Sequence, residues 1–284
     1  KQRIFQDLDK VCPAGTIFAS NTSALSITEM GRATQRPPKM IGMHFFNPAH
    51  VMKLVEIIKG EDTEVETVDD LVAFTESLRK IPVVVKECPG FLVNRLLMPY
   101  LNEATICLQE GAGTAQEIDD AMTAYGWPMG PFTLMDFLGL DVCYDVGAYL
   151  YSQYGERMKG AVMFEKLYKA GRYGEKVGAG FYGYGDNTDE PVKAMIAELT
   201  GGQKLSEFTP ERLMYPLINE AAYAVQENIA DVRDIDMAMI AGIVGAPERA
   251  EKLIGEMQAE IERVRRLCSA DTLVRALVRL LPLA

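Results

Sequence analysis

The chain has 284 residues, of which 48% are hydrophobic and 24% charged, proportions that are ordinary for a globular protein. Its formal net charge of −11 argues against a nucleic-acid-binding protein, which would normally present a basic face. No apolar run approaches the roughly 18 residues that a membrane span needs, and the length suggests roughly two or three domains.

Cysteine usage bears on compartment and on metal binding. The five cysteines are Cys12, Cys88, Cys107, Cys143 and Cys268. They are odd in number, widely spaced and contain no CxxC pair, which is neither the pattern of a disulfide framework nor that of a zinc site. We therefore expect no metal, and a reducing, cytoplasmic environment.

The first 86 residues alternate strand and helix signals, which predicts the rear portion of a doubly wound α/β sheet. Short apolar runs predict strands at 16–20, 39–45, 53–58 and 81–85. Before the last of these, Thr63 and Glu66 have the spacing of a helix capping box. An apolar stripe at helical spacing follows, formed by Val68, Leu71, Val72, Thr75 and Leu78.

From Cys88 onward the periodicity is helical, and Pro89 suits a helix start. The chain then repeats itself at an offset of 117 residues, with twelve identities in 28 positions from Arg95 to Met122. The identical positions in the first copy are Arg95, Leu96, Pro99, Asn102, Glu103, Ala104, Gln109, Glu110, Ile118, Asp119, Ala121 and Met122. Two copies of one helical module are the economical interpretation.

These patterns divide the chain into an α/β part at 1–86, a first helical domain at 87–185, a linker at 186–205 and a second helical domain at 206–284. The segment Gly178-Ala-Gly-Phe-Tyr-Gly183 matches G-x-G-x-x-G, but it follows no strand and opens no helix. We interpret it as a turn that closes the first helical domain. After Met239 the repeat stops matching, and the apolar stripes of the divergent tail suit core helices or a partner-binding helix.

Three polar residues, Ser23, His44 and Glu56, stand where predicted strands end. His44 is one of only two histidines, and the connection from 45 to 52 can bring it close to Glu56. A carboxylate beside an imidazole fixes its tautomer and favours the imidazolium, as a general base requires. The spacing alone leaves two interpretations open, a catalytic base or an ordinary buried histidine.

Asn94 is predicted to lie in the first turn of a helix, where its amide could donate to a substrate oxygen. Its neighbour Arg95 recurs in the second copy as Arg212, whereas the position of Asn94 is occupied there by Glu211. That difference is expected if Asn94 belongs to a site that only the first copy contains, although neutral substitution at a surface position would produce it as well.

Four segments together resemble the L-3-hydroxyacyl-CoA dehydrogenase family: "IFASNTSALSIT", "IGMHFFNPAHVMKLVEIIKG", "CPGFLVNRLLMPYLNEA" and "YGWPMGPFTLMDFLGLD". The similarity runs from Lys1 to about Tyr184. The second helical copy resembles the dehydrogenase part of the multifunctional fatty-acid oxidation proteins. The resemblance implies the C-terminal part of a Rossmann-type NAD-binding domain, followed by two repeated helical C-terminal domains.

The resemblance also implies roles for individual residues. His44 would be the catalytic base and Glu56 its partner, while Ser23 and Asn94 would bind the 3-oxygen region of the substrate. For the cofactor, Ser23 would also lie beside the nicotinamide, and Asn47 and Lys1 match family positions that touch NAD. The other histidine, His50, matches no catalytic position, and we expect it to be a loop residue.

The implied activity is NAD-dependent oxidation of L-3-hydroxyacyl-CoA to 3-ketoacyl-CoA, in fatty-acid β-oxidation or related butanoate metabolism. The implied assembly is a homodimer through the helical domains, alone or within a larger multifunctional enzyme. The glycine-rich phosphate fingerprint of the family would precede Lys1, so the chain is expected to be either a fragment or a truncated protein. Ala241 stands where some relatives have a substrate-contacting tyrosine. The alternative is a non-catalytic dimerisation or structural role.

Overall fold

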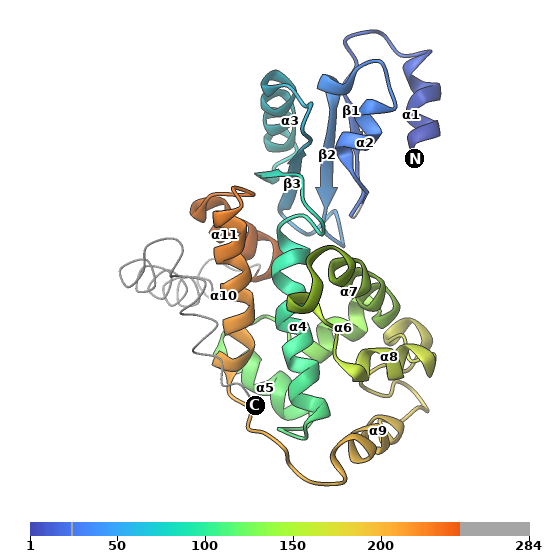
Figure 1. Cartoon of the computed structure of the whole chain (residues 1–284), viewed down its shortest axis with the longest axis vertical. Helices are drawn as coiled ribbons and strands as arrows, with labels where there is room; N and C mark the ends of the chain where they lie inside the picture. Colours follow the sequence, from blue (N-terminus) through green and yellow to red (C-terminus); the bar gives the residue numbers. More distant parts are fainter. Residues whose placement is uncertain (24, 245–284) are drawn as a thin grey trace. The chain divides into compact units, whose positions relative to one another are not determined.

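A computed structural model describes residues 1–23 and 25–244 (Figure 1). The described residues form two compact units. One comprises Lys1–Asn94 together with the described residues from Ala222 onward, and the other comprises Arg95–Ala221. The apolar segments predicted after residue 244 and the fifth cysteine, Cys268, lie outside the described residues.

The first unit is built on a mixed four-stranded sheet, in the order β1 (Phe18–Ser20), β2 (Met40–Phe45), β3 (Leu54–Lys59) and β4 (Ile81–Lys86). All four predicted strands are therefore confirmed. β1 pairs with β2 and β3 with β4 in parallel, but β2 and β3 are antiparallel. The short connection between β2 and β3 explains this departure from a wholly parallel sheet, because a parallel crossover needs a dozen or more residues.

The two faces of this sheet are covered by different helices (Figure 1). α3 (Val65–Ser77) covers one face, and α2 (Ile27–Arg32) lies against the other. The core under α3 consists of Ile41, Met43, Val55, Ile57, Val68 and Leu71. Because side chains alternate along a strand, His44 and Glu56 belong to the face opposite α3. On that same face Gly42 is required, since a Cβ there would lie 2.8 Å from the Cβ of Ile58.

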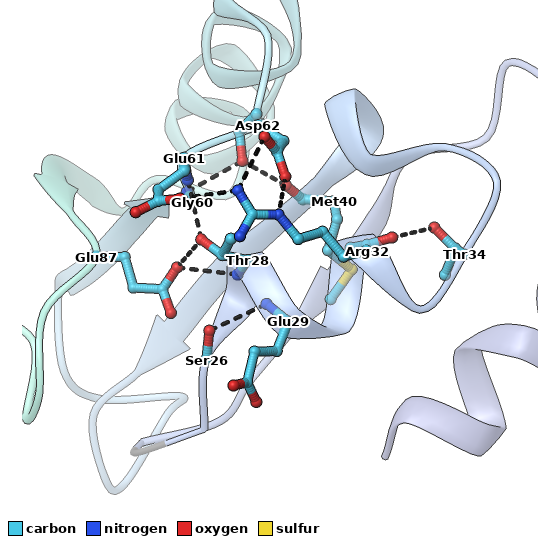
Figure 2. A network of polar contacts seen from close by, with 12 residues as sticks. Ser26, Thr28, Glu29, Arg32, Thr34, Met40, Gly60, Glu61, Asp62 and Glu87 are labelled. Atoms are coloured by element: carbon cyan, nitrogen blue, oxygen red, sulfur yellow. Dashed lines mark hydrogen bonds and ion pairs between the residues drawn. The ribbon is translucent and has the colours of Figure 1, made fainter.

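Carboxylate and hydroxyl groups fix α2 to the sheet (Figure 2). Glu87, just after β4, accepts hydrogen bonds from the backbone N–H groups of Ile27 and Thr28, both at 2.9 Å. Ser26 caps the same helix by accepting from the backbone N–H of Glu29 at 3.0 Å. Figure 2 also shows Arg32, at the other end of α2, directed at the carboxylates of Glu61 and Asp62.

The capping box predicted at the start of α3 is wrong. The residue that caps α3 is Glu64, and it makes no side-chain cap bond. The Thr63 hydroxyl instead donates to the backbone oxygen of Met40 at 2.6 Å and accepts from the backbone N–H of Gly60 at 3.0 Å. The Thr63 hydroxyl therefore bonds to these backbone groups rather than to the N–H groups at the start of α3.

The predicted helix start at Pro89 is also wrong. Gly90 and Phe91 have left-handed backbone conformations, with φ of 77° and 52°, which an α-helix cannot include. The chain makes a turn there, and α4 begins at Val93.

The helices after this turn form the second unit, except for Val93, Asn94 and the described residues from Ala222 onward, which belong to the first. Their bounds are α4 (Val93–Gln109), α5 (Ala115–Tyr125), α6 (Pro131–Leu138), α7 (Leu140–Tyr154), α8 (Val162–Lys169), α9 (Glu190–Thr200), α10 (Pro210–Gln226) and α11 (Val232–Met239). α9 lies within the predicted linker 186–205. α11 packs on β4 in the first unit, where the Lys86 N–H donates to the Ile229 oxygen at 2.8 Å. The remaining helical segments are α1 (Gln2–Asp9), 3₁₀ turns at Pro37–Lys39, Gly155–Met158 and Glu175–Val177, and a π-helical turn at Ile240–Val244.

The glycine-rich segment at 178–183 forms a turn, as predicted, and its backbone is bonded to α6. The Asp136 carboxylate accepts from the backbone N–H groups of Phe181 and Tyr182, at 2.8 and 3.0 Å. A Cβ at Gly180 would lie 2.0 Å from an oxygen of Asp136, so only glycine fits there. The motif therefore folds around an internal carboxylate.

α4 and α10 have the same length, 17 residues, and α10 begins at Pro210, 117 residues after Val93. Two ion pairs join the helices inside the second unit. Arg95 Nε lies 2.6 Å from Glu220 Oε1, and Arg212 Nε lies 2.7 Å from Glu103 Oε1. Arg95 and Glu220 are both buried.

Candidate active site

Three of the predicted site residues form a continuous hydrogen-bonded row. The Ser23 hydroxyl oxygen lies 3.1 Å from Nε2 of His44, and Nδ1 of His44 lies 2.7 Å from Oε2 of Glu56. His44 and Glu56 are directly opposite each other in the antiparallel register of β2 and β3. The backbone pairing of two strands therefore fixes the imidazole against the carboxylate.

Glu56 is completely buried, and its second oxygen is also satisfied. Oε1 accepts from the backbone N–H groups of Leu92 and Val93, at 3.0 and 2.9 Å. Both N–H groups stand at the start of α4, where the helix dipole favours negative charge. A carboxylate suits this position because each of its oxygens is required as an acceptor.

These contacts define the tautomer of His44. Because Oε2 of Glu56 is an acceptor, Nδ1 of His44 carries the proton that is shared between them. In a neutral imidazole Nε2 then has the free lone pair, and it accepts from the Ser23 hydroxyl. His44 is only 6% exposed whereas Ser23 is exposed, so the basic nitrogen points toward the accessible end of the row.

Two aromatic rings and one amide complete the surroundings of His44, and sequence reasoning missed all three. The ring centroids of Phe46 and Phe91 lie 4.8 and 5.7 Å from that of the imidazole. The Asn21 side-chain oxygen accepts from the backbone N–H of Phe45 at 2.9 Å, which ties the turn bearing Ser23 to the end of β2. A usable sequence signal for the position of Phe91 was the Pro89-Gly90 dipeptide, which marks a turn rather than a helix start.

The other predicted site residues are not linked to the row by side-chain bonds. Asn94 is half-buried in the first turn of α4, directly after the donors to Glu56, and its side chain forms no hydrogen bond within residues 1–23 and 25–244. Asn47 and His50 are exposed in the loop between β2 and β3. Lys1 is exposed at the start of α1.

Metal binding finds no support in the described part of the chain. No group of three or more histidine, cysteine, aspartate or glutamate side chains there could hold a metal ion. Four cysteines, Cys12, Cys88, Cys107 and Cys143, form no disulfide with one another. Among the same residues, no helix combines the length and hydropathy that crossing a bilayer demands.

Comparison with known proteins identifies the family. Residues 1–88 match the sequence model for the NAD binding domain of 3-hydroxyacyl-CoA dehydrogenase, and residues 90–184 match the model for its C-terminal domain. The chain belongs to the 3-hydroxyacyl-CoA dehydrogenase family. The resemblance recognised from the four sequence segments is thereby confirmed, and so is the succession of a Rossmann-like domain and a helical domain.

Curated relatives are considerably longer than this chain. The fatty acid oxidation complex subunit alpha of Acinetobacter baumannii strain SDF is 39% identical over 265 residues, which cover 88% of this chain but 36% of the relative. The subunit of the same name from Shewanella amazonensis is 39% identical over 267 residues, covering 90% and 38%. The chain thus spans little more than a third of these relatives.

Two solved structures share the fold. (S)-3-hydroxybutyryl-CoA dehydrogenase from Ralstonia eutropha is 40% identical, with a TM-score of 0.63 over 65% of this chain and 66% of that one. 3-Hydroxybutyryl-CoA dehydrogenase from Escherichia coli K12 is 26% identical, with a TM-score of 0.75 over 92% of this chain and 75% of that one.

Proposed function

We propose that this chain carries the dehydrogenase chemistry of its family, the NAD-dependent oxidation of L-3-hydroxyacyl-CoA to 3-ketoacyl-CoA in fatty-acid β-oxidation or related butanoate metabolism. The observation that carries the proposal is the Ser23–His44–Glu56 row. The names of the relatives, a fatty acid oxidation complex subunit and 3-hydroxybutyryl-CoA dehydrogenases, support the substrate class.

The residues around the row fit the nicotinamide end of NAD. Ser23 and Asn47 follow the carboxyl ends of the parallel strands β1 and β2, the edge at which α/β sheets bind ligands. Their hydroxyl and amide groups are suitable partners for a carboxamide. We propose that these two residues hold the nicotinamide, with Lys1 as a further contact, and that NAD, when bound, supplies the hydride acceptor.

The chain's own residues would perform the proton chemistry. Nε2 of His44, which carries no proton in this tautomer, takes the proton from the C3 hydroxyl of the substrate, while Ser23 and Asn94 orient that oxygen. Glu56 is already bonded to Nδ1 and stabilises the imidazolium that results. General-base assistance of this kind contributes roughly 10² to 10⁴ in rate.

The test is NADH oxidation with acetoacetyl-CoA, the reverse reaction. It is measured for the 284-residue chain and for an extended chain, to which the segment preceding the matched region in the Acinetobacter relative is joined at Lys1. Activity that disappears in the His44→Ala variant supports the proposal. Failure of both chains to oxidise NADH, when both are folded, refutes it and favours the structural role.

We also propose that the helical part contains two copies of one module, within the boundaries 87–185 and 206–284 and separated by 186–205. The equal lengths and the 117-residue offset of α4 and α10 support this. The ion pairs support it further. Arg212 and Glu220 are the counterparts of Arg95 and Glu103, and each arginine pairs with the glutamate of the other copy. Such a reciprocal exchange is expected of two related modules that face each other.

Assembly and compartment follow from the proposed family role. We propose a homodimer through the helical modules, within a larger multifunctional enzyme in the cytoplasm. Sedimentation velocity of the chain tests the dimer, and a single monomeric species at micromolar concentration would contradict it.

A further inference from the structure

The loop at 46–53 joins the two strands that hold His44 and Glu56. At its beginning, Phe46 packs its ring against the His44 imidazole. At its far side, the backbone N–H groups of Val51 and Met52 both donate to the oxygen of Pro48, at 2.9 and 3.0 Å. These internal bonds leave the backbone oxygens of Ala49 and Met52 available to an outside donor.

One ammonium group takes both oxygens. Nζ of Lys80 donates to the Met52 oxygen at 2.6 Å and to the Ala49 oxygen. Lys80 is half-buried, and within the described residues it forms no ion pair with any carboxylate. Its charge is therefore directed at the loop alone.

The local fold of the chain brings Lys80 to this position. After α3 ends, Arg79 adopts a left-handed conformation with φ of 59°, and the N–H of Lys80 donates back to the Thr75 oxygen at 3.2 Å. The next residue, Ile81, donates its N–H at 2.8 Å to the oxygen of Lys53, the last residue of the loop. Lys80 thus lies beside the point where the loop enters β3.

We propose that Lys80 is a positioning residue for the dehydrogenase reaction, a clamp that holds the loop 46–53 so that Phe46 covers His44 and Asn47 is presented beside it. The catalytic part of this inference rests on the proposed function. The row itself does not depend on the clamp, because strand register and the start of α4 fix His44 and Glu56. Loss of the clamp should therefore impair cofactor binding more than turnover.

The first test is hydrogen exchange of the 284-residue chain carrying Lys80→Met, with Lys59→Met as the matched control. Lys59 is also a half-buried lysine, and within the described residues its side chain forms no hydrogen bond. We expect loop amides at 46–53 to exchange about tenfold faster in Lys80→Met, the factor that one ordinary hydrogen bond represents. Exchange in β3 should be unchanged. Equal loop exchange in the two variants would overturn the proposal.

The second test uses the extended chain. We expect Lys80→Met to raise the KM for NADH about tenfold while kcat changes less than about twofold, and Lys80→Arg to restore much of the loss, since a guanidinium can also reach two oxygens. Kinetics equal to those of Lys59→Met, or a loss confined to kcat, would overturn the cofactor role. If unmodified extended chain and Lys59→Met are both inactive, the proposed function fails, while hydrogen exchange still decides whether Lys80 clamps the loop.

Discussion

Replacing Glu56 by glutamine keeps the shape of the side chain but removes the oxygen that accepts from Nδ1 of His44, on which the mechanism depends. The glutamine can still accept from the backbone N–H groups of Leu92 and Val93 through its oxygen. Its NH₂ group must then face Nδ1 of His44 and donate to it. This reverses the tautomer, so Nε2 carries the proton and can no longer accept one from a hydroxyl.

The size of the effect follows from these contacts. Loss of a functioning general base should lower kcat by roughly 10² to 10⁴, which is about 3 to 5 kcal/mol of barrier. Stability should fall by less, about 1 to 3 kcal/mol, because the side chain keeps its shape and loses only the charged character of its hydrogen bonds. The variant should therefore be folded and nearly inactive.

Glu87 provides a matched control for this experiment. It also accepts from two successive backbone N–H groups at a helix start, those of Ile27 and Thr28, but contacts no histidine. Glu87 uses a different oxygen for each N–H, so the NH₂ group of Glu87→Gln would face one of these two donors. The variant should therefore cost at least as much stability as Glu56→Gln and leave kcat within about twofold. The assay is NADH oxidation by the extended chain, with urea denaturation for stability. A Glu56→Gln variant that turns over like Glu87→Gln would refute the tautomer argument.

Two further predictions concern Asn94 and the glycines. Asn94→Ala should lower kcat/KM about tenfold in the NADH assay without changing the urea midpoint, whereas Glu211→Ala, at the matching position of the second copy, should change neither. A changed midpoint in Asn94→Ala would indicate a structural role. Gly180→Ala should cost at least about 2 kcal/mol in urea denaturation, because its Cβ would overlap Asp136, whereas Gly147→Ala inside α7 should stabilise by about 0.5 to 1 kcal/mol. Equal effects at the two glycines would contradict this packing.

Strand positions could be predicted from the sequence because each strand is a short apolar run bounded by polar turns. The proximity of His44 and Glu56 also followed from the short connection between them. Their register did not, since a loop of that length allows several pairings, and only one puts the two side chains opposite each other. The length of the loop limits which residues of β3 can pair with His44, and the packing of the sheet selects one register among them.

The predictions that were wrong rested on local hydrogen bonds, and the structure forms bonds to groups distant in sequence instead. Thr63 has the spacing of a helix cap, yet its hydroxyl bonds to Met40 on a neighbouring strand. The backbone donors to Glu56 were missed because they follow a left-handed turn at Gly90 and Phe91, where Pro89 had been interpreted as a helix start instead of as part of a Pro-Gly turn. Side-chain chemistry was thus easier to predict than the backbone groups that support it.

The imidazole itself offers the most direct test, because the chain contains only two histidines, His44 and the exposed His50. Nitrogen-15 NMR of the histidine-labelled chain, assigned with a His50→Gln variant, reports which ring nitrogen is protonated at a pH where the imidazole is neutral. We predict that His44 is protonated on Nδ1 and that Glu56→Gln moves the proton to Nε2. A His44 ring protonated on Nε2 in the unmodified chain, or one that exchanges freely between both forms, would contradict the account.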